Sequence, residues 1–220
     1  MAAQSADALY ANRRDLESAR RAADIWRAEL TRDSRAFEAA WKLARASYWL
    51  GGHATQAEGR RHFEAGIEAG RTAAGIEPGR PEGYFWMAAN MGALAESYGL
   101  RQGLKYRKPI KEALETVLRL NPAFEQGSAD RALGRWYFKV PGLFGGSRKL
   151  AEQHLRASLA YNEHSTASHY FLAEVLIDAG RRSEARAELQ KVLDAPSDGE
   201  WMPENLEFKE KAARLLRTLQ

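Results

Sequence analysis

The sequence contains no cysteine. Disulfide bonds, zinc sites built from thiolates and cysteine nucleophiles are therefore excluded. No apolar run approaches the roughly 20 residues that a membrane-spanning helix needs, so we expect a chain that does not cross a membrane. Neither sign of charge predominates, because 33 basic residues nearly balance 29 acidic ones and leave a net charge of +4. Without a clustered basic surface, we expect no nucleic-acid partner.

Period-two runs of β-branched residues are missing as well, and apolar residues recur instead at spacings of three and four. The first helix, expected at about 6–30, shows this pattern, with a single apolar stripe formed by Leu9, Leu16, Ala19, Ala23, Trp26 and Leu30. Clusters of Gly, Pro, Ser and Asp, such as "LGGHAT" and "EPGRPEG", separate the helical segments. The pattern predicts an all-α protein of roughly ten helices joined by short connections.

The helical segments also repeat. The stretch "STASHYFLAEVLIDAGRRSEARAELQKVLDAPSD" (165–198) predicts two antiparallel helices around a turn at Gly180, with Pro196 ending the second. Small residues such as Ala173 and Ala185 stand where the two helix backbones approach each other. We expect a single repeat domain over 1–220, with approximate units 6–35, 36–80, 81–123, 124–164 and 165–198 and a capping helix at 203–220.

This layout resembles the tetratricopeptide repeat (TPR), which implies a right-handed superhelix of about four helical hairpins between an N-terminal helix and the cap. The stretches "PEGYFWMAANMGALAE", "KPIKEALETVLRLNP" and "LGRWYFKVPGLFGGSRKLAEQHLRASL" narrow the resemblance. They are similar to bacterial T-component proteins of tripartite periplasmic (TRAP) solute transporters, and to the repeat proteins named regulators of microtubule dynamics.

The T-component resemblance implies an envelope accessory protein that works with a solute-binding protein, as a homo-oligomer. T-components are usually exported lipoproteins with a lipidated cysteine, and this chain has no cysteine. We expect a periplasmic or envelope location if an export signal has been removed, and a cytoplasmic location otherwise.

Catalytic motifs are absent from the sequence. The histidines form neither a His-Glu-x-x-His motif nor a pair at i, i+4; they are His53, His62, His154, His164 and His169. No Gly-x-Ser-x-Gly motif is present either. We therefore expect no enzyme, no cofactor and no metal site.

The TPR resemblance implies which residues line the concave face of the array, because fixed positions of each first helix point there. Carried over to this chain, they give candidate binding residues Lys42, Trp49, Phe85, Asn90, Arg131, Arg135, Phe138, Lys139, Tyr170 and Glu174. Arg131 and Arg135 share one helical face, with Lys139 a further turn along. Such a pair of guanidinium groups suits a carboxylate. The alternative is a solvated basic face, or pairing with Glu112 or Glu115 across the hairpin.

The aromatic and glycine-rich stretch "GRWYFKVPGLFGGSRK" (134–149) reads as the turn between two helices of one repeat, about five residues longer than the standard repeat has. Ser147 is placed to cap the helix that follows, and Phe144 is an apolar anchor. Two interpretations stay open. The loop either packs over a neighbouring hairpin or lines a pocket or subunit contact.

Two functions are compatible with these features. The first is a non-catalytic scaffold, an envelope accessory of a TRAP-type system that binds a partner protein or a small ligand with carboxylate and apolar parts. The alternative is a general adaptor that binds an extended acidic or C-terminal peptide. A peptide binder should show an open groove, and a ligand carrier an enclosed apolar pocket.

Overall fold

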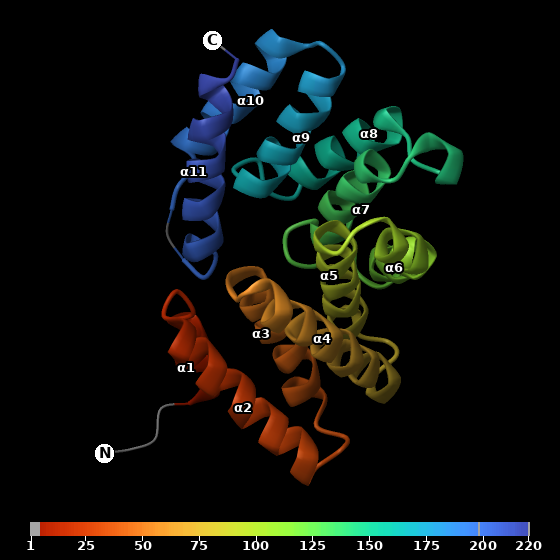
Figure 1. Cartoon of the computed structure of the whole chain (residues 1–220), viewed down its shortest axis with the longest axis vertical. Helices are drawn as coiled ribbons and strands as arrows, with labels where there is room; N and C mark the ends of the chain where they lie inside the picture. The colour runs from red at the N-terminus through yellow and green to blue at the C-terminus, as the bar shows by residue number, and fades with distance from the viewer. Residues whose placement is uncertain (1–4, 198, 220) are drawn as a thin grey trace. The chain divides into compact units, whose positions relative to one another are not determined.

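The computed structural model describes residues 5–197 and 199–219, except for the side chain at position 100. Within these residues the chain forms eleven α-helices, one short 3-10 helix and no strand, which confirms the all-α prediction. The helices group into two compact units, residues 1–121 and 122–220 (Figure 1). The division of 1–220 into one domain of five repeat units and a cap stays a prediction.

Unit 1 contains the first six helices: α1 (Ala6–Ala11), α2 (Leu16–Arg32), α3 (Phe37–His53), α4 (Gln56–Ile76), α5 (Pro81–Ser97) and α6 (Leu100–Leu120). Each of them packs against the next one along the chain, and α3 also packs against α5. Contact between helices two places apart is typical of stacked helical hairpins, because the first helices of neighbouring pairs meet.

Unit 2 contains the remaining elements: α7 (Ser128–Lys139), the 3-10 helix η1 (Gly142–Phe144), α8 (Arg148–Leu159), α9 (Thr166–Asp178), α10 (Arg182–Asp194) and α11 (Met202–Arg217). Here α9 packs against both α7 and α11, so these three helices form a row, and α8 and α10 pair with α7 and α9. Among residues 5–197 and 199–219, no helix combines the length and apolar character required to span a bilayer.

Local hydrogen bonds explain where several helices begin and end. The side chains of Asp15, Ser147 and Ser165 each accept a hydrogen bond from a backbone N–H of the first turn of α2, α8 and α9. Ser147 therefore caps α8 as predicted, with its Oγ 3.3 Å from the Leu150 N. At the other end of α9, Gly180 adopts a φ of +74°, a left-handed conformation that glycine tolerates without strain.

Glycine also lets α4 and α5 approach each other closely. A Cβ atom at Gly83 would lie 2.4 Å from the backbone N of Ala74, and one at Gly70 would lie 2.7 Å from the backbone N of Met87. No real Cβ contact is this short, so a side chain at either position would push the two helices apart. The backbones of α4 and α5 therefore pack directly against each other.

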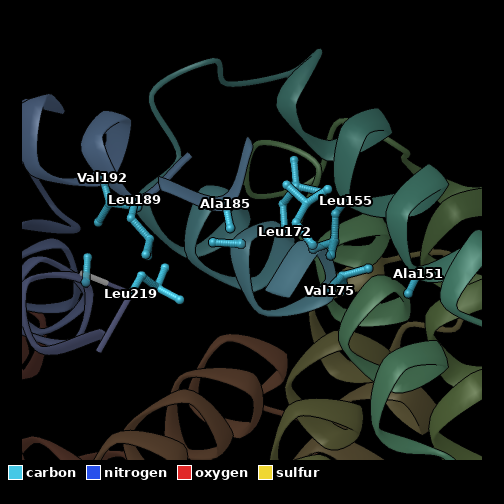
Figure 2. Close-up of a cluster of buried hydrophobic side chains, with 11 residues drawn as sticks. Ala151, Leu155, Leu172, Val175, Ala185, Leu189, Val192 and Leu219 are labelled. Atoms are coloured by element: carbon cyan, nitrogen blue, oxygen red, sulfur yellow. The ribbon is translucent and has the colours of Figure 1, made fainter. Parts of the chain in front are cut away.

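The core of unit 2 is built from small and branched aliphatic residues on four helices and just beyond the end of the last one. Its buried members are Ala151, Leu155, Leu172, Ala173, Val175, Leu176, Ala185, Leu189, Val192, Ala212 and Leu219. Figure 2 shows Leu155 and Leu172 close together, with Leu189, Val192 and Leu219 grouped at the other end of the cluster. This core fixes α9 between α8, α10 and α11, and so holds the outward-facing residues of α9 in place.

A polar network is buried beside this core. The His169 Nδ1 lies 2.5 Å from the Glu188 Oε2, and its Nε2 lies 2.7 Å from the Glu163 carbonyl oxygen. Both ring nitrogens of His169 thus face oxygen atoms. Lys191 donates a further bond to Glu188 at 2.9 Å. The His169 and Glu188 side chains are only 4% and 10% exposed, so the pair joins α9 to α10 away from water.

The Glu188 carboxyl should make the stability of unit 2 depend on pH. Burial acts to raise its pKa, but the hydrogen bonds from His169 and Lys191 outweigh burial, and the pKa lies below its ordinary value of 4.5. The ionised carboxyl therefore stabilises the folded state above pH 4.5, and this contribution is lost as the pH falls through the lowered pKa. Melting temperatures between pH 7 and pH 3 should show the advantage of the wild type over Glu188→Gln shrinking with acidity. A constant difference would contradict this assignment.

Candidate functional site

Three of the predicted binding residues are buried in unit 1, so we correct the prediction that they line an open face. Trp49 is 5%, Phe85 8% and Asn90 0% exposed. Trp49 Nε1 donates to the Arg13 carbonyl oxygen at 2.7 Å. The amide nitrogen of Asn90 donates to the carbonyl oxygens of Ala44, at 2.9 Å, and of Trp86. The positions of the repeat do not determine exposure here, because α3 and α5 pack against each other as well as against α4.

Lys42 is the fourth predicted residue in unit 1, and it is tied to acidic residues of its own unit. Its Nζ lies 3.0 Å from the Asp7 Oδ1 and 3.6 Å from the Glu38 Oε2. The side chain is 19% exposed and also lies over the Trp41 ring. The charge of Lys42 is thus already balanced within the chain, by α1 and by its own helix.

The structure brings the predicted residues of unit 2 together on one face. We call it the α7–α9–α11 face and define it by Arg131, Arg135, Phe138, Lys139, Tyr170, Glu174 and Phe208. All of these side chains are half-buried except Lys139, which is exposed. They come from helices that pack in a row, so a ligand could contact all three helices at once. This face is the best candidate for a binding surface in the described part of the chain.

The polar centre of the face is an ion-pair cluster between α7 and α9. Arg135 Nη1 donates to Glu174 Oε2, and Lys139 Nζ lies 3.8 Å from Glu174 Oε1. The guanidinium of Arg135 also lies over the Phe171 ring, 4.6 Å from its centroid. The predicted alternative partners of the arginines, Glu112 and Glu115, are instead paired within α6 with Lys108 and Lys111. Arg131 lies one turn before Arg135 on the same helix.

The aromatic part of the face joins α9 to α11. The Phe208 ring of α11 lies 5.6 Å from that of Tyr170 and 5.5 Å from that of Phe171, centroid to centroid. Burial, followed by the nearby charge of Glu174, raises the pKa of the Tyr170 hydroxyl above its ordinary value of 10.0. Tyr170 therefore remains neutral at physiological pH and can both donate and accept a hydrogen bond.

Two aromatic residues were not among the predicted binding residues: Phe208 of this face, and Phe171, which contacts Arg135 of the face. Phe171 follows Tyr170 directly, and nothing in the repeat pattern distinguishes it from an ordinary packing residue. Phe208 lies in the capping helix predicted at 203–220, and an aromatic residue in a terminal cap is a signal that could have indicated it. Both depend on how α11 packs against α9, which the sequence pattern does not specify.

A backbone hydrogen bond joins the two ends of the long turn between α7 and α8. Ser147 N donates to the Tyr137 carbonyl oxygen at 2.9 Å, and Gly145 adopts a φ of +100°. Gly146 is irreplaceable here, since a Cβ on it would lie 1.6 Å from the Val140 carbonyl oxygen. Leu143 at the tip is 89% exposed and Phe144 38%. Whether this loop binds a partner stays a prediction; the exposure of Leu143 is not what a purely packing role requires.

A second ion pair fixes the position of this loop relative to the face. Arg148, at the start of α8, donates to the carboxylate of Asp178 at the end of α9. This hydrogen bond lowers the pKa of Asp178 below its ordinary value of 3.8. Asp178 lies one turn beyond Glu174 on α9, so the residue that follows the loop is paired on the side of α9 that carries Glu174. The sequence gives no indication of this pair, whose members are far apart in the chain.

Unit 1 has an open groove of about 420 Å³ between α4 and α6, lined by Glu64, Ala65, Ile67, Glu68, Lys105 and Tyr106. The acidic residues that line it are paired within α4, Glu64 with Arg60 and Glu68 with Arg71. The groove is therefore lined mostly by polar side chains whose charges are paired, and its one buried apolar residue is Ile67. It has neither the aromatic cluster nor the converging cations of the α7–α9–α11 face.

Comparison with known proteins identifies the repeat and a family. The family model described as regulator of microtubule dynamics protein 1-3 matches residues 2–158. A tetratricopeptide repeat model matches residues 146–202, which include α8, α9 and α10. No curated protein sequence gives a significant match to this chain.

Solved structures agree in fold. The crystal structure of a thermophilic TPR protein of Thermus thermophilus is similar with a TM-score of 0.71 and 23% identity, over 94% of this chain and 95% of that one. The crystal structure of MamA is similar with a TM-score of 0.56 and 15% identity, over 97% of this chain and 99% of that one. At these identities the likeness establishes the TPR-type fold alone.

Proposed function

The chain belongs to the regulator of microtubule dynamics protein 1-3 family, and we propose that it is a non-catalytic TPR scaffold that binds an extended acidic protein segment on the α7–α9–α11 face. The observation that carries the proposal is that Arg135 and Lys139 converge on Glu174 of α9, with Arg131 one turn earlier on α7 and the Tyr170 ring in contact with that of Phe208. Cations bind the carboxylates of such a segment, and the rings contact its apolar side chains.

An extended segment fits this face better than a small molecule for two reasons. The charged side chains are spread along two turns of α7 and are partly exposed, with Arg135 21% and Lys139 40% exposed. A ligand must therefore span several residues to contact all of them. One charge-assisted hydrogen bond contributes about 1.5–3 kcal/mol, so useful affinity needs several contacts together.

The second candidate is a small ligand with a carboxylate and an apolar part, in an accessory protein of a TRAP-type transporter. Its support is the sequence resemblance to T-components and the closeness of the Arg135 guanidinium to the ring of Phe171, which in turn contacts the ring of Tyr170. The two candidates differ in the length of ligand that saturates the face. A short carboxylic acid should compete fully with a peptide only under the second.

Replacing Arg131 and Arg135 together by alanine should weaken the binding of an acidic peptide at least tenfold, because two of the three cations of the face are removed. The probe is a fluorescein-labelled peptide that repeats two glutamates and one leucine, followed by fluorescence anisotropy. Its glutamine counterpart should bind weakly to both proteins.

The matched control removes the same charge elsewhere. Arg156→Ala with Arg182→Ala changes α8 and α10, the second helices of the two hairpins, and should leave affinity within about twofold. Circular dichroism should show unchanged helix content in both double variants. Equal affinity of the wild type and the Arg131/Arg135 variant would rule out this face as the binding surface.

A further inference from the structure

Glu174 occupies the position on the α7–α9–α11 face where a bound carboxylate would be expected. Its two oxygens face different cations, Oε2 the guanidinium of Arg135 and Oε1 the ammonium of Lys139 at 3.8 Å. The cations come from α7 and the carboxylate from α9, so the contact is made by packing between hairpins and not within one helix. Neither cation is therefore fully available to a ligand while this contact is in place.

The contact is placed so that a ligand can replace it. Glu174 and Arg135 are 22% and 21% exposed, which leaves part of each head group in reach of solvent. The ring of Phe171 also contacts the guanidinium, so Glu174 is not alone in orienting Arg135. Ion pairs of this partly exposed kind contribute little to folding, so exchanging Glu174 for a ligand carboxylate costs little stability.

Two carboxylates cannot share this position at low cost, because like charges a few ångströms apart repel each other strongly outside bulk water. A ligand with a single carboxylate would gain Arg135 and Lys139 only by displacing an equivalent group, with almost no net benefit. A segment with several closely spaced carboxylates can in addition contact Arg131, one turn away on α7. Such a segment gains contacts that Glu174 does not already provide.

We propose that Glu174 is an intrachain competitor for the α7–α9–α11 face, which makes the face selective for segments with several neighbouring carboxylates over ligands with one. The inference rests on the proposed function and adds the charge density of its partner. Under this proposal the removal of Glu174 strengthens binding, whereas the removal of an ordinary lining residue weakens it.

The test compares Glu174→Gln with the wild type in anisotropy titrations against two labelled peptides. One is the glutamate–leucine peptide above, and the other is its glutamine–leucine counterpart with a single glutamate. The variant should bind the first peptide about tenfold more tightly and should bind the second with an affinity that the wild type lacks. Glu174→Ala should give the same two gains, and melting curves of both variants establish that they fold.

The control variant is Glu184→Gln. Glu184 lies on α10 in an ion pair with Arg181, so this change alters the net charge equally without touching the face. Its affinities should match those of the wild type, which separates local competition from the general effect of a more basic protein.

The remaining outcomes distinguish this inference from the proposed function. If the Arg131/Arg135 variant loses binding while Glu174→Gln and Glu174→Ala bind no better than the wild type, the competitor role is wrong and the binding face stands. Weaker binding by both Glu174 variants overturns the competitor role as well, since the carboxylate would then be orienting Arg135. If no protein binds the acidic peptide, the proposed function is wrong and the inference falls with it.

Discussion

Replacing His169 by alanine is expected to lower the free energy of unfolding by about 3–4 kcal/mol, the largest effect that we predict for a single side chain outside the aliphatic core. The substitution removes two hydrogen bonds, to Glu188 and to the Glu163 carbonyl oxygen. It leaves the Glu188 carboxylate buried with only Lys191 as a partner. A carboxylate that loses one of its two partners in a site about one-tenth exposed is strongly destabilised.

Urea unfolding followed by circular dichroism measures this change. The matched control is His164→Ala, whose ring nitrogen Nε2 lies 3.9 Å from the Glu163 Oε1. The two side chains are 64% and 86% exposed, so water replaces the lost partner and the cost should be below about 1 kcal/mol. Similar losses in the two variants would show that burial of the His169 pair does not determine its contribution.

Replacing Gly83 by alanine is expected to destabilise the protein by about 2–3 kcal/mol, although alanine is the better helix former. The new methyl group would lie 2.4 Å from the backbone N of Ala74 and 2.9 Å from the carbonyl carbon of Ala73. These are backbone atoms inside α4 and cannot move without shifting the helix. The gap between α4 and α5 would therefore have to widen along its length.

Gly75→Ala is the matched control, because it makes the same chemical change on the partner helix. A Cβ at Gly75 meets nothing within 4 Å, so alanine there should raise stability by up to about 1 kcal/mol through helix propensity. Thermal melts of the two variants should thus move in opposite directions. A stabilised Gly83→Ala variant would show that α4 and α5 separate easily, against the close packing described above.

Which segments form helices follows from local patterns in the sequence. Apolar spacing predicts the helical segments, Ser147 predicts the start of α8, and Gly180 predicts the turn after α9. Each of these signals acts within about one turn of helix. The prediction failed where exposure was assigned from the position in the repeat alone. Trp49 and Asn90 belong to the core because α3 and α5 approach each other there, and Gly66 leaves space for the Asn90 side chain.

In the candidate site, too, local spacing predicts part of the arrangement and tertiary packing decides the rest. The sequence placed Arg131, Arg135 and Lys139 on one side of a helix, because their spacing follows the helical period.

By itself, then, the sequence determined the helical segments, the cap at Ser147 and the repeat, although the single helix expected over 6–30 is divided into α1 and α2. Only the tertiary structure decided which charges meet. The partner of Arg135 is Glu174, 39 residues away on another hairpin, and Arg148 meets Asp178 across 30 residues. The physical reason is that helical periodicity is a short-range property of the chain, whereas ion pairs between helices depend on packing angle and on side-chain burial.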